Sequence, residues 1–305
     1  MNVSINPSYY CNFRCNFCYL TEQQLSDKTL LSTGRIRDLM LSISKNTQIT
    51  SVDIYGGEIC LLPEKYLNEL IDGCLEFTSD VNLVTNLSHI HSSFLRDDVT
   101  ISVSYDFDAR EKHELVFQNM MKLSRPYSII VLVTPLVLQK APADIINIFN
   151  SVASITDVEL KPYSSNQANS LKVTNYQFDQ YVIEWLQLLK QMRFNFINAN
   201  WLDSVLSKTR NMYSDDHLYI TPNGHLSVLS FDSNSREYFQ MLNDFNEYES
   251  WCEKEKQQVL QNNHCISCDF RGHCLTEHAR PFDDLEQGTC DGHLGVIKWY
   301  QKNGN

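Results

Sequence analysis

The sequence predicts an α/β protein, a partial (β/α)6 TIM-like barrel with a small C-terminal domain of a β-hairpin and helix. Short apolar runs alternate with helix-length amphipathic stretches about six times in the first 200 residues, which is typical of a parallel sheet covered by helices. Later residues change to a hairpin signal, a polar helix and a loop-rich cysteine region. We therefore expect a barrel over residues 1–205 and a second domain over residues 206–305, with the boundary between about Asn200 and Asp215.

Apolar periodicity places the individual elements. Strands are predicted at residues 3–6, 51–55, 82–85, 100–104, 129–134 and 157–161. Helices are predicted at residues 36–43, 66–77 and 178–192. Two further short strands are expected within residues 218–231, on either side of the turn at Pro222, Asn223 and Gly224. The active site of such a barrel lies at the C-terminal ends of its strands.

Composition and charge argue against several classes of protein. No stretch approaches the roughly 18 apolar residues of a membrane span, and the N-terminus has no basic region before an apolar run. We therefore expect no membrane association and a cytoplasmic location. A net charge of -12, with 25 scattered Lys and Arg residues, argues against nucleic-acid binding. Ten cysteines in a reducing compartment indicate metal binding rather than a disulfide framework.

Three cysteines follow the first predicted strand in a C-x3-C-x2-C loop, at Cys11, Cys15 and Cys18. Thiolates are soft ligands that select iron–sulfur clusters or zinc. Three thiolates on one short loop can cap three corners of a cubane, which leaves the fourth iron open to chelate a small molecule. A zinc knuckle or a chance grouping is the alternative.

This loop resembles the signature of the radical S-adenosylmethionine (SAM) superfamily, with Phe17 in the aromatic position before the third cysteine. The resemblance implies that Phe17 and Tyr19 contact the adenine of SAM, although both could equally be core aromatics. It implies an oxidoreductase or maturase with a [4Fe-4S] cluster, in which one electron from a flavodoxin or ferredoxin cleaves SAM. The products are methionine and a 5′-deoxyadenosyl radical, which abstracts hydrogen from a substrate carbon.

Gly56, Gly57 and Glu58 follow the second predicted strand. Glycines permit close backbone approach and positive φ, and a carboxylate can accept hydrogen bonds from an ammonium group. Such a triplet alone is usually a turn, but at this place it resembles the superfamily's GGE motif, which holds the methionine amino group. Residues near later strand ends resemble positions that line the cofactor and substrate cavity in relatives: Thr85, Asn86, Ser102, Ser104 and Asp106.

Four more cysteines lie near the C-terminus, at Cys265, Cys268, Cys274 and Cys290. On spacing alone they fit a zinc tetrahedron or a cubane equally well. With the first motif upstream, they resemble the C-terminal half of a SPASM region and imply a second, auxiliary [4Fe-4S] cluster with four cysteine ligands. Two other ligand positions of that region hold Leu229 and His278 here. We therefore expect the inner auxiliary cluster to be absent, as in a twitch domain, and the outer one to transfer electrons or act as a scaffold.

Three cysteines remain. Cys60 and Cys74 lie in apolar patterns and fit small hydrophobic side chains. Cys252 lies beside Trp251 in a polar segment. In epimerases of the superfamily a thiol delivers a hydrogen atom to the substrate radical, which makes Cys252 the candidate catalytic thiol. A partly buried structural cysteine is the alternative.

Relatives with SPASM-like regions mostly modify ribosomally made peptides by crosslinking, thioether formation or epimerisation, so a peptide is the first expected substrate. Only ten residues precede Cys11, which leads us to consider either a separate protein that recognises a leader peptide or a small-molecule substrate. Twitch-bearing relatives of similar size act on aminoglycosides and other sugars, which keeps a small-molecule sugar as the alternative. A third hypothesis is a non-catalytic zinc or iron–sulfur interaction module. The place of Gly56 to Glu58 directly after the second predicted strand argues against it.

Overall fold

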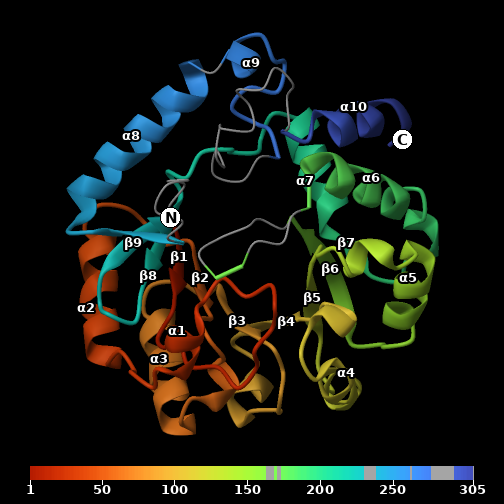
Figure 1. Cartoon of the computed structure of the whole chain (residues 1–305). Coiled ribbons are helices and arrows are strands. Elements are labelled where there is room, and N and C mark those ends of the chain that lie inside the picture. Colours follow the sequence, from red (N-terminus) through yellow and green to blue (C-terminus); the bar gives the residue numbers. More distant parts are fainter. Residues whose placement is uncertain (163–167, 170–172, 230–237, 262, 276–291, 305) are drawn as a thin grey trace.

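A computed structural model describes residues 1–162, 168–169, 173–229, 238–261, 263–275 and 292–304. The described strands form one curved sheet with the order β10-β9-β8-β1-β2-β3-β4-β5-β6-β7 (Figure 1). The strands are β1 (Asn2–Ile5), β2 (Ser51–Ile54), β3 (Val81–Thr85), β4 (Thr100–Ser104), β5 (Tyr127–Leu132), β6 (Ile155–Lys161), β7 (Asn195–Phe196), β8 (His217–Ile220), β9 (Leu226–Leu229) and β10 (Phe239–Leu242). The predicted α/β fold with a partial barrel is confirmed.

Helices cover the outer face of the curved sheet, while its other face lines the interior (Figure 1). The described helices are α1 (Glu22–Ser26), α2 (Thr33–Ser44), α3 (Glu64–Leu75), α4 (His113–Lys122), α5 (Pro142–Asn150), α6 (Asn175–Leu186), α7 (Ile197–Leu206), α8 (Phe245–Gln261), α9 (Asn263–Ile266) and α10 (Leu294–Asn303). None of them is long and apolar enough to cross a membrane.

The six predicted barrel strands are all present, with bounds within two residues of those expected. The helix predicted at 178–192 differs, because α6 ends at Leu186 and a separate 3₁₀ turn follows at Leu189–Gln191. The apolar pattern of the sequence continues through this turn, but none of its residues is buried. No packing therefore holds it as part of the helix.

The strands beyond residue 205 extend the barrel sheet. β8 pairs in parallel with β1, with Ile5 opposite Ile220, and β8 and β9 form the predicted antiparallel hairpin. Gly224 in its turn has a φ of +77°, a conformation that favours glycine. The expected boundary at residues 205 and 206 falls at the end of α7, and the division into two domains stays a prediction.

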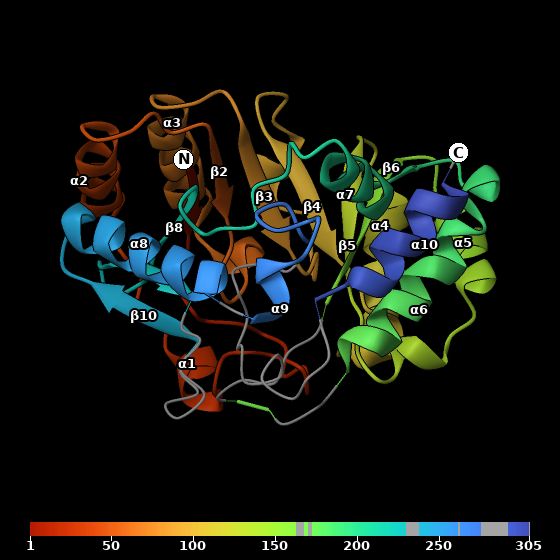
Figure 2. The same cartoon turned by 90° about the horizontal axis from the view of Figure 1, so that it is seen from above.

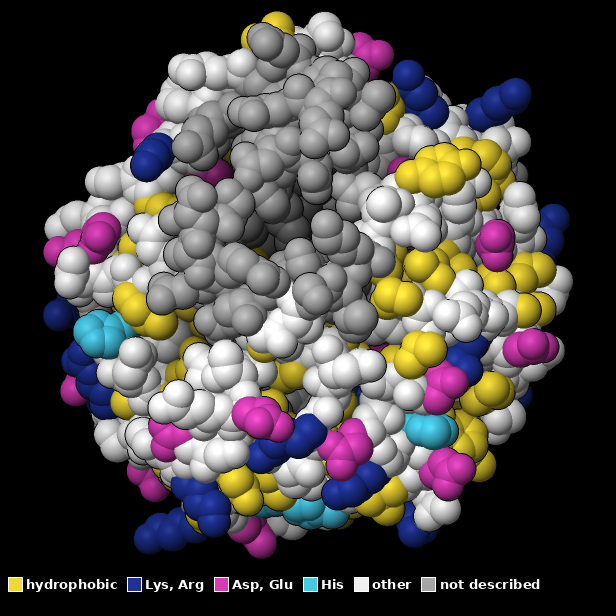
Figure 3. Space-filling view, viewed as in Figure 1, with side chains coloured by type: hydrophobic (Ala, Val, Ile, Leu, Met, Phe, Trp, Pro, Cys, Tyr) yellow, Lys and Arg dark blue, Asp and Glu magenta, His cyan; other side chains and the backbone are white. Residues whose placement is uncertain are grey.

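Strands β1 to β6 are parallel, so their C-terminal ends meet on one face of the molecule. Figure 2 shows α1 and the loop before it on this side of the sheet. In the space-filling view of the face shown in Figure 1, Lys and Arg side chains at the rim are interspersed with Asp and Glu (Figure 3). In the described part of this face, the rim is therefore neither uniformly positive nor uniformly negative.

The interior of the barrel is partly polar. The amide of Asn82 on β3 donates to Asp53 Oδ1 on β2 at 2.8 Å and accepts the hydroxyl of Ser102 on β4 at 3.1 Å. Burial raises the pKa of Asp53, while the contact with Asn82 and the charge of Lys161 oppose that rise. A polar group with hydrogen-bonding potential therefore points into the barrel from three adjacent strands.

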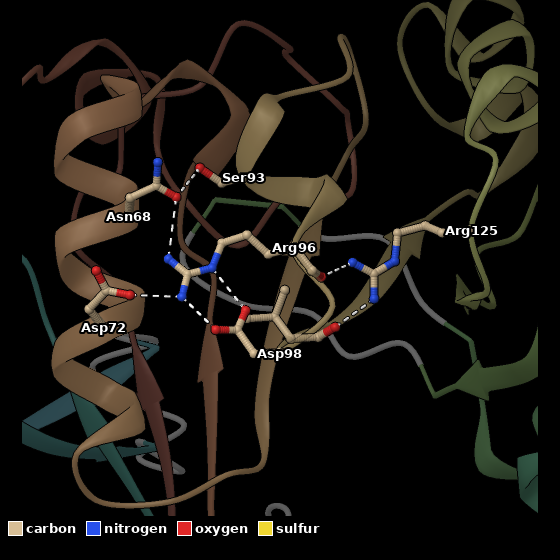
Figure 4. A network of polar contacts seen from close by, with 7 residues as sticks. Asn68, Asp72, Ser93, Arg96, Asp98 and Arg125 are labelled. Carbon is tan, nitrogen blue, oxygen red and sulfur yellow. Dashed lines mark hydrogen bonds and ion pairs between the residues drawn. The ribbon is translucent and has the colours of Figure 1, made fainter.

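A network of arginines fastens the chain before β4 (Figure 4). Arg96 forms ion pairs with Asp72 on α3 at 2.7 Å and with Asp98 at 2.6 Å. Arg125 donates to the backbone carbonyls of Phe94 at 3.0 Å and Val99 at 2.7 Å, and also to that of Arg96. Because Arg125 alone satisfies three carbonyls of one connection, it anchors the entry into β4.

We expect Arg125→Ala to lower the free energy of unfolding by about 2–4 kcal/mol, because it removes charge-assisted hydrogen bonds from partly buried carbonyls. Urea unfolding followed by circular dichroism measures the change. Arg37→Ala is the matched control, since Arg37 pairs with Glu76 through side chains that are each 49% exposed. That exposed pair should contribute little, so equal losses in the two variants would contradict an anchoring role for Arg125.

Candidate active site

The cysteine loop follows β1, with Cys11 six positions after Ile5, and lies at the C-terminal edge of the sheet. Cys11 is 8% exposed, and Cys15 and Cys18 are partly exposed. The thiol of Cys11 accepts the amide of Phe13 at 3.4 Å, and that of Cys18 accepts the amide of Leu20 at 3.4 Å. Hydrogen bonds to sulfur stabilise its anionic form, which suits ligands of an iron–sulfur cluster.

Burial and nearby charges act against each other at these thiols. Burial raises the pKa of Cys11 to about 12, and Glu58, Cys18 and Cys15 contribute to the rise. Burial also raises the pKa of Cys15 and Cys18, while the guanidinium of Arg110 opposes the rise at both. Because metal ligands must be deprotonated, Arg110 favours the form of the thiols that binds metal.

Among the described residues, no three His, Cys, Asp or Glu side chains are grouped so that they could hold a single metal ion. A zinc ion needs its thiolates about 2.3 Å from one point. A cubane binds each thiolate through a different iron, so its ligands stand farther apart. The three loop thiols are a set of soft donors on one short loop, and by that chemistry they fit a cluster.

The loop after β2 contacts the backbone just before Cys11. The amide of Gly57 donates to the carbonyl of Ser8 at 3.0 Å, and the amide of Glu58 donates to that of Tyr10 at 2.9 Å. A Cβ atom on Gly57 would lie 2.2 Å from the carbonyl oxygen of Tyr9. Gly56 has a φ of +140°, and a Cβ atom there would lie 2.4 Å from the oxygen of Ser8. The close approach expected of these glycines is thus, in the structure, an approach to the chain's own backbone.

Glu58 is 5% exposed and ties the ends of β2 and β3 together. Its Oε1 accepts the amide of Cys60 at 2.8 Å and the hydroxyl of Thr85 at 2.5 Å, and its Oε2 accepts the amide of Asn86 at 2.6 Å. A carboxylate has about four acceptor positions. Three are therefore used by the protein, which makes Glu58 first of all a part of the scaffold beneath the cysteine loop.

Asn86 connects this scaffold to the cysteine loop. Its amide donates to Asn12 Oδ1 at 3.3 Å and lies 3.8 Å from the sulfur of Cys11. Asn12 in turn donates to the hydroxyl of Ser88 at 2.9 Å. The structure therefore brings Glu58, Asn86 and Cys11 together, and adds Asn12 and Ser88, which no spacing rule indicates.

Arg14 and Asn169 also hold the cysteine loop, although no sequence motif indicates either residue. The guanidinium of Arg14 donates to the carbonyls of Cys11 at 2.7 Å and Phe13 at 2.8 Å. The amide of Asn169 donates to the carbonyls of Phe17 and Cys18, each at 3.1 Å. Asn169 lies more than 150 residues from its partners, so only the folded chain shows the contact.

The expected adenine and cavity residues have protein neighbours of their own. Phe17 is 8% exposed, and Tyr19 stacks on Tyr238 with ring centroids 4.1 Å apart while its hydroxyl donates to Asn6 Oδ1 at 3.2 Å. Ser102 faces the polar interior, and Ser104 is partly buried at the end of β4. Their contacts with SAM stay predictions.

Three of the four C-terminal cysteines lie within the described residues. Cys265 is in α9, the amide of Cys268 donates to its carbonyl at 3.1 Å, and the thiol of Cys274 contacts the carbonyl of Gly292 at 3.0 Å. Cys290 and His278 lie outside the described residues, so a four-thiolate site stays a prediction. Leu229, where a SPASM region has a ligand, is 6% exposed and packs in a cluster with Tyr219 and Phe239.

Cys252 lies on α8 with 5% of its surface exposed. Its thiol points toward the carbonyl of Ser214 at 3.9 Å, and burial raises its pKa to about 12. Ser214 is itself held by Glu255, whose carboxylate accepts its hydroxyl at 2.7 Å. Cys252 is thus packed against protein groups, and its role as a hydrogen-atom donor stays a prediction. Cys60 and Cys74, each 1% exposed, are buried as expected of small hydrophobic side chains.

We expect Gly57→Ala to detach the cysteine loop from β2, because the added methyl group would collide with the carbonyl oxygens of Tyr9 and Tyr10. Amide hydrogen exchange should then be faster across residues 8–18. Gly73→Ala in α3 is the matched control, since a Cβ atom there meets nothing within 4 Å. Unchanged exchange in the Gly57 variant would show that the close contact does not hold the loop.

No protein-family model and no curated protein matches this chain. Solved structures match over nearly its whole length. Streptococcus suis SuiB bound to S-adenosylmethionine is 15% identical, with a TM-score of 0.63, over 95% of this chain and 75% of SuiB. Native anSMEcpe with bound AdoMet is 13% identical, with a TM-score of 0.68, over 99% of this chain and 95% of anSMEcpe. At these identities the likeness shows the fold, and the chain has the fold of these radical SAM enzymes.

Proposed function

We propose that this protein is a radical SAM enzyme that modifies a peptide. The observation that carries the proposal is the three-thiol loop beyond β1, held by backbone hydrogen bonds to the Gly-Gly-Glu loop beyond β2. Both loops lie at the C-terminal strand ends of a barrel shared with structures solved with SAM bound. Motif, placement and fold therefore agree, although each of them alone would be weaker support.

In this proposal Cys11, Cys15 and Cys18 hold a [4Fe-4S] cluster. When bound, the cluster supplies the electron that cleaves SAM to methionine and a 5′-deoxyadenosyl radical, which takes hydrogen from the substrate. The chain's own residues bind and orient the reactants. The Gly-Gly-Glu loop fixes the position of the thiols, and the buried Glu58 keeps the ends of β2 and β3 in register beneath them.

A peptide substrate is supported by the structural neighbours. SuiB has been solved bound to precursor peptide SuiA, at 15% identity and a TM-score of 0.62 to this chain. The anSMEcpe enzyme has been solved with the Cp18Cys and Kp18Cys peptides, each at 12% identity and a TM-score of 0.69. We therefore place a peptide before a sugar as the substrate to be tested.

The proposal includes a second [4Fe-4S] cluster on Cys265, Cys268, Cys274 and Cys290, and a flavodoxin or ferredoxin as electron donor. Support for the second cluster comes from the spacing of these cysteines and from the tight turn at Gly272, which has a φ of +83° between Cys268 and Cys274. With all four irons ligated, this cluster would transfer electrons or support the fold rather than bind substrate.

Changing Cys11, Cys15 and Cys18 together to Ala should remove about four irons per chain and abolish production of 5′-deoxyadenosine, because a [4Fe-4S] cluster loses all its protein ligands. Iron analysis after anaerobic reconstitution and chromatography of the products with dithionite measure both effects. Cys74→Ala removes a buried thiol outside the loop and should retain the activity. Undiminished production in the triple variant would refute the proposed function.

Changing Cys268 to Ala should remove or open the second cluster and lower the iron content from about eight per chain toward four, if that site is a [4Fe-4S] cluster. His278→Ala should leave the iron content unchanged, since His278 is not among the proposed ligands. A loss of about four irons in the His278 variant would instead indicate a further cluster. Zinc at the Cys268 site would contradict the auxiliary iron–sulfur cluster.

A further inference from the structure

A buried ion pair lies next to the cysteine loop. Asp106 and Arg110 have side chains that are 1% and 10% exposed. Asp106 Oδ2 accepts two hydrogen bonds from the guanidinium, from Nη2 at 2.6 Å and from Nε at 3.0 Å. Its other oxygen, Oδ1, accepts the amide of Leu132 on β5 at 2.5 Å. The carboxylate therefore fixes Arg110 in one orientation and is itself fixed to the sheet.

The pair belongs to a turn that contacts the cysteine loop directly. The guanidinium carbon of Arg110 lies 5.4 Å from the ring centroid of Phe17, the residue before Cys18. One residue further along, the carboxylate of Glu111 accepts the backbone amide of Arg14. Contacts from two consecutive residues hold this turn against the loop, with the positive charge of Arg110 beside Phe17 and the carboxylate of Glu111 at the amide of Arg14.

Packing alone does not explain this pair. Burying two charges costs several kcal/mol each in desolvation, so a buried ion pair is weak evidence for a role in stability. In a site of low dielectric constant, however, a fixed charge acts strongly on its neighbours. The guanidinium of Arg110 is such a charge, because it lies against Phe17 of the cysteine loop and its ion pair with Asp106 is almost wholly buried.

Such a charge bears on electron transfer to a cluster at this loop. Reduction moves one electron from the reduced donor protein to the cluster, whose net charge becomes more negative by one, and breaks no bond. A nearby positive charge stabilises the reduced cluster and raises its reduction potential, whereas a negative charge lowers it. Charge near the cluster is one of the factors that set the potential of iron–sulfur clusters.

We propose that Arg110 raises the reduction potential of the cluster on Cys11, Cys15 and Cys18, and that Asp106 positions Arg110 and limits the rise. This inference rests on the proposed function, because it requires the cluster. Arg110 acts through space rather than as a ligand, which makes it a positioning residue for the electron-transfer step. Neither residue of the pair makes the backbone hydrogen bonds between the Gly-Gly-Glu loop and the cysteine loop, so changing the pair leaves those hydrogen bonds in place.

The experiment measures the midpoint potential by anaerobic redox titration followed by electron paramagnetic resonance. The signal to follow is the one that changes when SAM is added, because it belongs to the cluster with an open iron. Arg110→Gln should lower the potential by at least 59 mV, which corresponds to a tenfold change for one electron. Asp106→Asn should raise it, and Arg110→Lys, which keeps the charge, should remain close to the parent protein.

Opposite shifts distinguish this role from a structural one, because damage to the loop would move both variants in the same direction. Shifts of the same sign, or none, would overturn the inference. The double variant Asp106→Asn/Arg110→Gln removes a neutral pair and should lie near the parent. If Arg110→Gln does not fold, Asp106→Asn decides alone, with a raised potential as support and any other result as contradiction.

The exposed pair of Arg37 and Glu76 provides the control, since Arg37→Gln changes the same charge in a solvated pair and should leave the potential unchanged. Failure of the inference is distinguishable from failure of the proposed function. A parent protein whose spectrum has no signal that responds to SAM would contradict the function itself. A responsive signal with unshifted potentials would contradict only the role of Arg110 and Asp106.

Discussion

The position of the cysteine loop depends on two backbone hydrogen bonds, from the amides of Gly57 and Glu58 to the carbonyls of Ser8 and Tyr10. They form because β1 and β2 are paired in register, with Ile5 opposite Ile54, so that the two strands deliver their loops to the same place. A side chain at Gly57 would occupy the space of the carbonyls it contacts. The position of the thiols therefore depends on the pairing of β1 with β2 and on residue 57 being a glycine, which has no Cβ atom.

A second layer of constraint lies beneath this contact. Glu58 is a buried carboxylate, and such a group is stable only where donors replace its water. The amide of Asn86 and the hydroxyl of Thr85 supply them from the end of β3, and Asn86 then reaches Asn12 in the cysteine loop. Three adjacent strand ends are thus one hydrogen-bonded unit. A ligand bound at any of them would meet a scaffold that is already ordered.

The sequence predicts those features that depend on local pattern. Apolar periodicity indicated all six barrel strands, and spacing indicated the cysteine and Gly-Gly-Glu loops at their ends. It could not indicate that β8 pairs with β1, or that Asn169 reaches the carbonyls of Phe17 and Cys18, because such contacts join distant segments through the strand order. The backbone contacts of Gly56 and Gly57 could not be indicated for the same reason, and their contact with SAM stays a prediction.

The net charge of the chain does not describe the electrostatics of this site. The protein carries a formal charge of -12, yet the charged groups around the cysteine loop include two arginines. Arg14 directs its guanidinium at the carbonyls of Cys11 and Phe13, so its charge serves to close the loop. The buried Asp106 holds the guanidinium of Arg110, and water competes little for this ion pair because both side chains are almost wholly covered. This buried pair therefore contributes to the local field at the loop and is screened far less by salt than the exposed charges that make up most of the net charge.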